Sequence, residues 1–180
     1  MRMYNELDIV REVSKRLDDA EIGYMLTGSM AMNYYAEPRM TRDIDMVVAL
    51  EPDDAKRLVT LFKSDYYVAR EAVETSIRNH SMFNLIHNES VIKVDFIVRK
   101  ESVFRLNEFE RRQRITLRDF ETWIVSLEDL ILSKLFWAKD SHSDFQLRDV
   151  KNLITRGCDR KYIEGWTHEL GVLDLWREIQ

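Results

Sequence analysis

One stretch of the chain, residues 24–50, constrains the fold more than any other part of the sequence. It begins with a short apolar strand that ends in Thr27-Gly28-Ser29, and a short helix is expected to follow. Thirteen residues beyond this turn, Asp43-Ile44-Asp45 opens a second apolar strand. Side chains alternate along a strand with a period of two, so Asp43 and Asp45 point to the same face.

The two halves of this stretch together predict a site for a nucleoside triphosphate and magnesium. Neighbouring carboxylates repel each other unless a cation lies between them. Magnesium prefers one or two carboxylates combined with substrate phosphates. Gly28 lets the backbone approach a phosphate, and the start of the following helix favours an anion. Either half alone is more often a tight turn or a wet strand edge, whereas their order and spacing favour the site.

A third carboxylate lies further along the chain. Asp95 is embedded in the apolar, β-branched run VIKVDFIV at 91–98, where Val94, Phe96 and Val98 would share the opposite face. Burying an unpaired carboxylate is costly, and metal coordination would explain its presence in such a run. The alternative is an aspartate that simply faces solvent.

The spacing of these motifs resembles the signature of the DNA polymerase β-type nucleotidyltransferase superfamily. The matching residues are TGS, then thirteen residues, then DIDMVV, with Asp95 as the third carboxylate. The resemblance implies an α+β (α/β) fold: a nucleotidyltransferase-like mixed β-sheet flanked by helices, followed by a C-terminal helical region. It also implies that Asp43, Asp45 and Asp95 are catalytic and bind two Mg²⁺ ions, for which Mn²⁺ could substitute, and that Asp95 accepts the proton of the attacking hydroxyl.

The resemblance extends into the second half of the chain. Residues 126–154 are similar to the tail of stand-alone bacterial nucleotidyltransferase-like proteins related to the AbiEii toxins, and the match carries over Lys134, Gln146, Arg148 and Asp149. Lys134 would then compensate charge on the leaving pyrophosphate, whereas the alternative is a snorkelling surface lysine. The residues expected to bind nucleotide phosphates are Thr27, Gly28, Ser29, Arg42 and Lys134. For Arg42 an ion pair with an acid is the alternative.

Composition is that of a globular, cytoplasmic protein. The chain has 180 residues, a net charge of −5 and one cysteine, Cys158, so an intrachain disulfide is excluded and a reducing compartment is expected. No apolar run is long enough to suggest a leader or a membrane span. Residues 99–118 carry seven Arg and Lys against three Glu. This excess indicates either a solvated helix face or a patch that faces RNA or polyphosphate.

Hydrophobic periodicity predicts the remaining elements. Helices are expected at 5–20, 29–35, 53–62, 71–78, 103–110, from Ser126 onward, 162–170 and 173–179, and strands at 82–87, 91–98, 114–117 and 122–125. The hairpin of 82–98 would place Asp95 in the same sheet as Asp43 and Asp45. We expect a catalytic core at 1–125 and a C-terminal helical region packed on it at 126–180.

The function expected from the residues and the resemblance is metal-dependent transfer of a nucleoside monophosphate from a nucleoside triphosphate to an acceptor hydroxyl. The resemblance favours RNA or protein as acceptor and a toxin-type role with a cognate antitoxin. Three alternatives stay open: a silent nucleotide-binding or protein-interaction module, a nucleic-acid-binding regulator that uses residues 99–118, and a phosphohydrolase.

Overall fold

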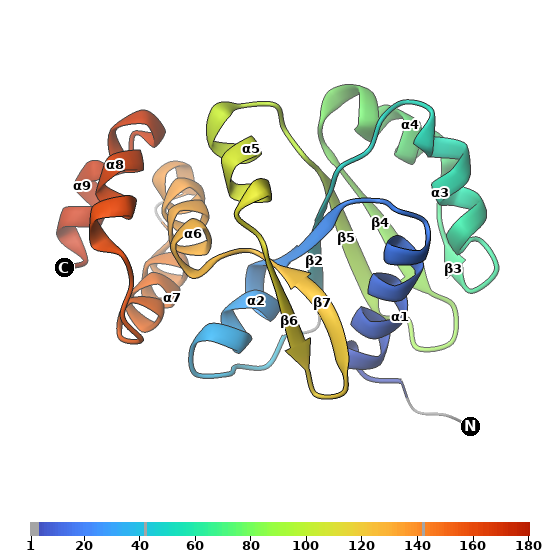
Figure 1. Ribbon diagram of the computed structural model, residues 1–180, viewed down its shortest axis with the longest axis horizontal. Helices are drawn as coiled ribbons and strands as arrows, with labels where there is room; N and C mark the ends of the chain where they lie inside the picture. The colour runs from blue at the N-terminus through green and yellow to red at the C-terminus, as the bar shows by residue number, and fades with distance from the viewer. Residues whose placement is uncertain (1–3, 42, 142) are drawn as a thin grey trace.

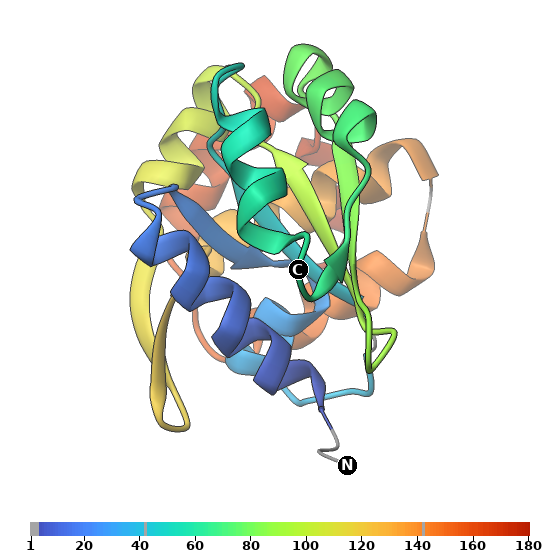
Figure 2. The same cartoon turned by 90° about the vertical axis from the view of Figure 1, so that its right-hand side faces the viewer.

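The computed structural model describes residues 4–41, 43–141 and 143–180, and within them a seven-stranded mixed sheet is flanked by helices (Figures 1 and 2). The strand order is β3-β4-β5-β2-β1-β7-β6. This architecture confirms the predicted fold class. The strands are β1 (Tyr24–Thr27), β2 (Asp43–Val48), β3 (Tyr66–Tyr67), β4 (Met82–His87), β5 (Lys93–Val98), β6 (Gln113–Leu117) and β7 (Phe120–Ile124).

Most of the helices fall into two groups around this sheet, and α2 and α5 lie between the groups (Figure 1). In Figure 1, α1, α3 and α4 lie on one side of the molecule, and α6 to α9 gather at the opposite end. Their bounds are α1 (Glu6–Asp19), α2 (Gly28–Tyr35), α3 (Asp54–Phe62), α4 (Arg70–Asn79), α5 (Val103–Glu110), α6 (Leu127–Ser141), α7 (Asp144–Ile154), α8 (Arg160–Leu170) and α9 (Leu173–Glu178). None of the helices in the described part of the chain is both long and apolar enough to cross a membrane.

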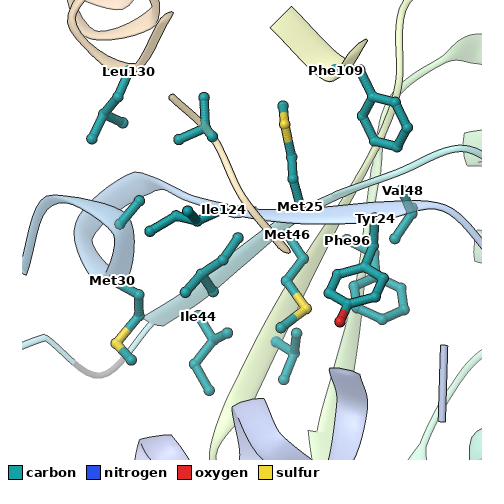
Figure 3. Packing of buried hydrophobic residues seen from close by; sticks show 14 of the residues in the cluster. Tyr24, Met25, Met30, Ile44, Met46, Val48, Phe96, Phe109, Ile124 and Leu130 are labelled. Carbon is teal, nitrogen blue, oxygen red and sulfur yellow. The ribbon is translucent and has the colours of Figure 1, made fainter. Parts of the chain in front are cut away.

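Apolar side chains cover both faces of the central strands. On one face, Phe96 of β5 meets Phe62 of α3 edge to face, with 5.8 Å between the ring centroids. Met25 of β1 points the other way, on the side of the sheet where Phe109 and Leu130 lie (Figure 3). All five of these side chains are buried. The central strands are therefore fixed from both sides, which holds their polar ends in register.

Most predicted elements are present, with shifts at their ends. β5 begins at Lys93 rather than at residue 91, because Val91 has a φ of 59° and belongs to the turn that precedes the strand. β2 ends at Val48 instead of Leu50. The two-residue strand β3 was not predicted, since two residues are too few to show an alternating pattern.

The C-terminal helical region begins directly after Ser126, where a helix is expected from the sequence. The hydroxyl of Ser126 accepts a hydrogen bond from the backbone N–H of Asp129 at 3.3 Å and donates one to its carboxylate at 2.6 Å. A serine with an acid three residues later thus begins α6, as the sequence indicates. β7 leads directly into this helix, so the helical region continues from a strand that lies between β1 and the edge strand β6.

Candidate functional site

Polar side chains from neighbouring strands form one row across the sheet. Asp45 of β2 is in register with Asp95 of the parallel strand β5 and with Thr27 of the antiparallel strand β1. Asn84 of β4 continues the row beyond Asp95. Residues in register on adjacent strands point to the same face, and Asp43 shares that face two positions before Asp45. The sheet therefore brings the three predicted carboxylates together.

The Gly-Ser turn lies directly against this row. Gly28 begins α2 with a φ of 59°, and a Cβ added to it would stand 2.2 Å from Oδ2 of Asp45. Only glycine fits a positive φ and so close an approach. The first backbone N–H groups of α2 have no partner within a helix and face outward from its N-terminus. The structure thus places a potential phosphate-binding turn and the carboxylates in contact.

Repulsion among the carboxylates shapes the electrostatics of the site. The pKa of Asp45 is raised to about 6, chiefly by burial and then by the charges of Asp95 and Asp43. Lys93 opposes this effect, since its Nζ lies 3.0 Å from Oδ2 of Asp95 and 3.7 Å from Oδ1 of Asp43. Asn84 donates a hydrogen bond from Nδ2 to the other oxygen of Asp95. A positive charge near these carboxylates therefore stabilises the cluster.

This donor set has the chemistry that magnesium prefers, namely carboxylate oxygens beside a place for phosphate. Within the described residues, however, no three Asp, Glu, His or Cys side chains converge on a point that could hold a metal ion. The carboxylates of Asp43 and Asp95 turn toward Lys93 instead. The three aspartates are ligands of the type that a divalent cation prefers, and they lie on the same face of the sheet. To hold such an ion, the side chains of Asp43 and Asp95 would have to turn from Lys93 toward it.

A second polar cluster joins the Gly-Ser turn to the C-terminal helices. Lys134 of α6 is 5% exposed and donates to Oδ2 of Asp149 at 2.7 Å and to Gln146 at 3.2 Å. Arg39 donates to the same oxygen of Asp149 at 3.2 Å and to the hydroxyl of Ser29 at 2.8 Å. Lys134 is therefore a buried, paired cation and not a snorkelling surface lysine. Its charge also lowers the pKa of Asp45, as a smaller effect than the burial and repulsion that raise it.

Three residues of the site escaped the sequence analysis: Asn84, Lys93 and Arg39. Lys93 lies two positions before Asp95, so the period of a strand could have placed it on the same face. Asn84 could be found only from the register of the hairpin, and Arg39 only from the tertiary structure. The predicted phosphate ligand Arg42 lies outside the described residues.

A cavity of about 420 Å³ opens beside the row. Thr27, Val47 and Ile97 line it from the sheet, and α5, α6 and α8 close it. Val47 and Ile97 each follow an aspartate of the row by two residues, so they share its face about 7 Å further along the strands. A molecule in this cavity would contact Thr27, which is in register with Asp45.

The far wall of the cavity combines aromatic rings with an ion pair between the half-buried Arg105 and the buried Glu108. Arg105 donates to Glu108 at 2.9 and 3.0 Å and to the hydroxyl of Ser133 at 2.7 Å. Its guanidinium also lies over the rings of Phe104 and Phe136, at 5.1 and 5.7 Å from their centroids. Burial raises the pKa of Glu108. The wall is thus mostly apolar with one fixed polar edge, a pattern typical of small-molecule sites.

Cations of the segment 99–118 are engaged with acids of the protein itself. Arg111 donates to Asp129 at 3.0 Å, and Arg114 donates to Asp18 at 3.2 Å. Together with the pairing of Arg105, these contacts use much of the positive charge counted in the sequence. The arrangement favours internal ion pairs over an open basic surface for nucleic acid.

Comparison with protein-family models and with curated proteins finds no match. Among solved structures, an antigenic nucleotidyltransferase-like protein from Paracoccidioides brasiliensis is similar with a TM-score of 0.65 and 18% identity, over 96% of this chain and 88% of that one. The lincosamide antibiotic adenylyltransferase LnuA, bound to lincomycin, gives a TM-score of 0.57 and 14% identity, over 86% and 99%. ANT(2")-Ia in complex with adenylyl-2"-tobramycin gives 0.57 and 10%, over 91% and 94%. At these identities the likeness shows the fold, which is nucleotidyltransferase-like.

Proposed function

This chain has a nucleotidyltransferase-like fold, and we propose that it is a metal-dependent nucleotidyltransferase. It would move a nucleoside monophosphate from a nucleoside triphosphate to an acceptor hydroxyl. One observation carries the proposal: Thr27, Asp45 and Asp95 are in register across β1, β2 and β5, and the backbone of Gly28 touches Asp45. A turn suited to phosphates and carboxylates suited to magnesium then act on the same atoms.

The phosphates are held at the N-terminus of α2. Backbone N–H groups of Gly28 and Ser29 donate to phosphate oxygens, and the hydroxyl of Ser29, oriented by Arg39, adds a side-chain contact. The side chain of Thr27, which precedes the turn and is buried, supports its position. Lys134 compensates charge that develops on the leaving pyrophosphate.

Asp43, Asp45 and Asp95 would hold Mg²⁺ or Mn²⁺, which would neutralise the triphosphate and lower the pKa of the acceptor hydroxyl. The acceptor oxygen forms a bond to the α-phosphorus as the bond to the bridging oxygen of the β-phosphate breaks. Pyrophosphate leaves with that electron pair, and the hydroxyl proton passes to Asp95, whose orientation Asn84 fixes. Atoms and charge balance without a further reactant.

The acceptor belongs to one of two classes, a macromolecule or a small hydroxylated molecule. The sequence resemblance favours RNA or protein, in a toxin-type enzyme silenced by a cognate antitoxin. The cavity lined by Thr27, Val47 and Ile97 favours a small hydroxylated molecule, and LnuA and ANT(2")-Ia are seen with lincomycin and with an adenylylated tobramycin. The cavity accommodates a small molecule or a single residue of a polymer, but not the polymer itself.

The test is a transfer assay with each α-labelled nucleoside triphosphate, Mg²⁺ and a cell extract separated by size into small molecules, RNA and protein. We expect label in one fraction with the wild type, and a loss of at least about 100-fold in Asp45→Asn. Asp140→Asn is the matched control, since Asp140 is exposed on α6. Wild-type rates in Asp45→Asn would refute the proposal.

Two further outcomes identify alternatives. Magnesium-dependent binding of a nucleotide without labelled product would indicate a nucleotide-binding module. Release of free phosphate or pyrophosphate without any acceptor would indicate a phosphohydrolase.

A further inference from the structure

Lys93 places an ammonium group inside the carboxylate cluster. It is the first residue of β5 and stands in register with Asp43 on the parallel strand β2. Its Nζ lies 3.0 Å from Oδ2 of Asp95 and 3.7 Å from Oδ1 of Asp43. Because period two puts Lys93 on the same face as Asp95, this position is set by the backbone and not by one chance rotamer.

The contacts of Lys93 compete with those a metal ion would make. Asp95 is almost fully buried, and its two oxygens are engaged by Asn84 and by Lys93. Asn84 is neutral, so the charge of Asp95 is balanced by Lys93. A divalent cation can gain Oδ2 of Asp95 and Oδ1 of Asp43 only if the ammonium moves away. The lysine side chain is 41% exposed, which gives it room to do so.

We propose that Lys93 is a built-in counter-cation of the cluster, which holds Asp43 and Asp95 in the free protein and yields its place when a divalent cation arrives with a nucleotide. The inference rests on the function proposed above. Displacing an ammonium from two carboxylates lowers the affinity of the free protein for metal. A triphosphate reverses the balance, because it adds ligands to the metal and offers the freed ammonium a new anionic partner. Lys93 thereby couples metal loading to nucleotide binding.

The first arm of the test measures Mn²⁺ binding to the free protein, either by calorimetry or by the electron paramagnetic resonance signal of unbound Mn²⁺. We expect Lys93→Gln to bind Mn²⁺ at least about tenfold more tightly than the wild type, because the competing charge is gone. Lys93→Arg keeps the charge and should stay within about threefold of the wild type. Lys63→Gln, at an exposed lysine at the end of α3, changes the net charge equally and should have no effect.

The second arm repeats the titration with the non-hydrolysable analogue α,β-methylene-ATP. The affinity of Lys93→Gln for Mn²⁺ should now exceed that of the wild type by less than about threefold, because the ammonium of Lys93 can pair with the triphosphate in the wild type. An advantage that persists at tenfold would overturn the coupling. Equal Mn²⁺ affinity of the wild type and Lys93→Gln in the first arm, with both folded by circular dichroism, would overturn the proposal as a whole.

These outcomes are separable from failure of the transferase function. If Asp43→Asn and Asp45→Asn leave Mn²⁺ binding unchanged, the carboxylates are not the metal site, and both proposals fall. If those variants weaken Mn²⁺ binding while Lys93→Gln does not strengthen it, only the role of Lys93 is wrong.

Discussion

At Gly28 the backbone passes so close to Asp45 that a side chain has no room. The positive φ adds a second restriction, because residues with a Cβ rarely adopt it. Both constraints arise where the Gly-Ser turn meets the carboxylate row. Local strain at a site of this kind costs about 1 to 3 kcal/mol when it is forced on another residue.

Gly28→Ala should therefore lower the free energy of unfolding by about 1 to 3 kcal/mol and abolish nucleotide transfer, since the methyl group displaces either the turn or Asp45. Urea denaturation and the transfer assay measure the two effects. Gly165→Ala is the control: Gly165 lies inside α8, and beyond its chain neighbours and the backbone of its own helix no atom lies within 4 Å of an added Cβ. It should gain up to about 1 kcal/mol in stability. Full activity in Gly28→Ala would contradict the proposed contact.

Asp45 makes stability depend on pH in a direction set by its raised pKa. The folded protein keeps the proton of Asp45 up to about pH 6, whereas the unfolded chain loses it near 3.8. The stabilising contribution is thus complete below pH 4 and is lost as pH rises through 6. In EDTA, Asp45→Asn should be more stable than the wild type by about 1 to 3 kcal/mol at pH 7.5, and the difference should vanish near pH 4.

Urea titrations across this pH range check the prediction for Asp45, with Asp140→Asn as a control that should show no such trend. A stability gain in Asp45→Asn that grew toward low pH would mean that burial and repulsion do not govern this carboxylate.

Among the elements, α6 and α7 are joined to the segment that follows α2 by one carboxylate. Asp149 of α7 accepts hydrogen bonds from Lys134 of α6 and from Arg39, which follows α2. Asp149 and Lys134 are both buried. Removing one partner of a buried pair leaves an uncompensated charge, and the cost depends on how many partners are left behind.

Asp149→Leu should cost about 3 to 5 kcal/mol, because it leaves the cations of Lys134 and Arg39 without a common acceptor. Lys134→Met should cost less, since Asp149 keeps Arg39. The double variant should lose less than the sum of the two. Thermal and urea unfolding measure these values. Lys15→Met at the exposed pair with Asp19 is the control and should change stability by less than about 1 kcal/mol.

In the molecule as a whole, residues 1–125 and 126–180 are packed against each other. β7 inserts beside β1 and runs directly into α6, whose buried residues include Leu130, Ile131 and Leu135. Figure 1 shows α6 between the sheet and the last helices. Residues 1–125 and 126–180 therefore bury apolar surface against each other.

We expect the full chain to unfold in one transition, followed alike by circular dichroism and by tryptophan fluorescence. A fragment of residues 1–125 should show no cooperative transition, because losing α6 exposes apolar surface that the core cannot bury alone. A fragment with a steep transition of its own would establish 1–125 as an independent domain.

Local patterns in the sequence predict most of the helices and strands and the face that the carboxylates share. Period-two alternation fixed the face shared by Asp43 and Asp45, and the apolar run around Asp95 indicated a third carboxylate in the same sheet. These are local signals, carried by side chains a few residues apart, so they can be read before the chain is folded.

Which side chains from distant parts of the sequence complete the site depends on how the strands and helices pack together. Asn84 reaches the cluster through the register of β4 with β5, and Arg39 reaches Ser29 and Asp149 across elements that are not neighbours in sequence. The partner of Lys134 was likewise set by the packing of α6 against α7. Pairing energies between segments far apart in the chain depend on register and packing, which no local pattern of residues encodes.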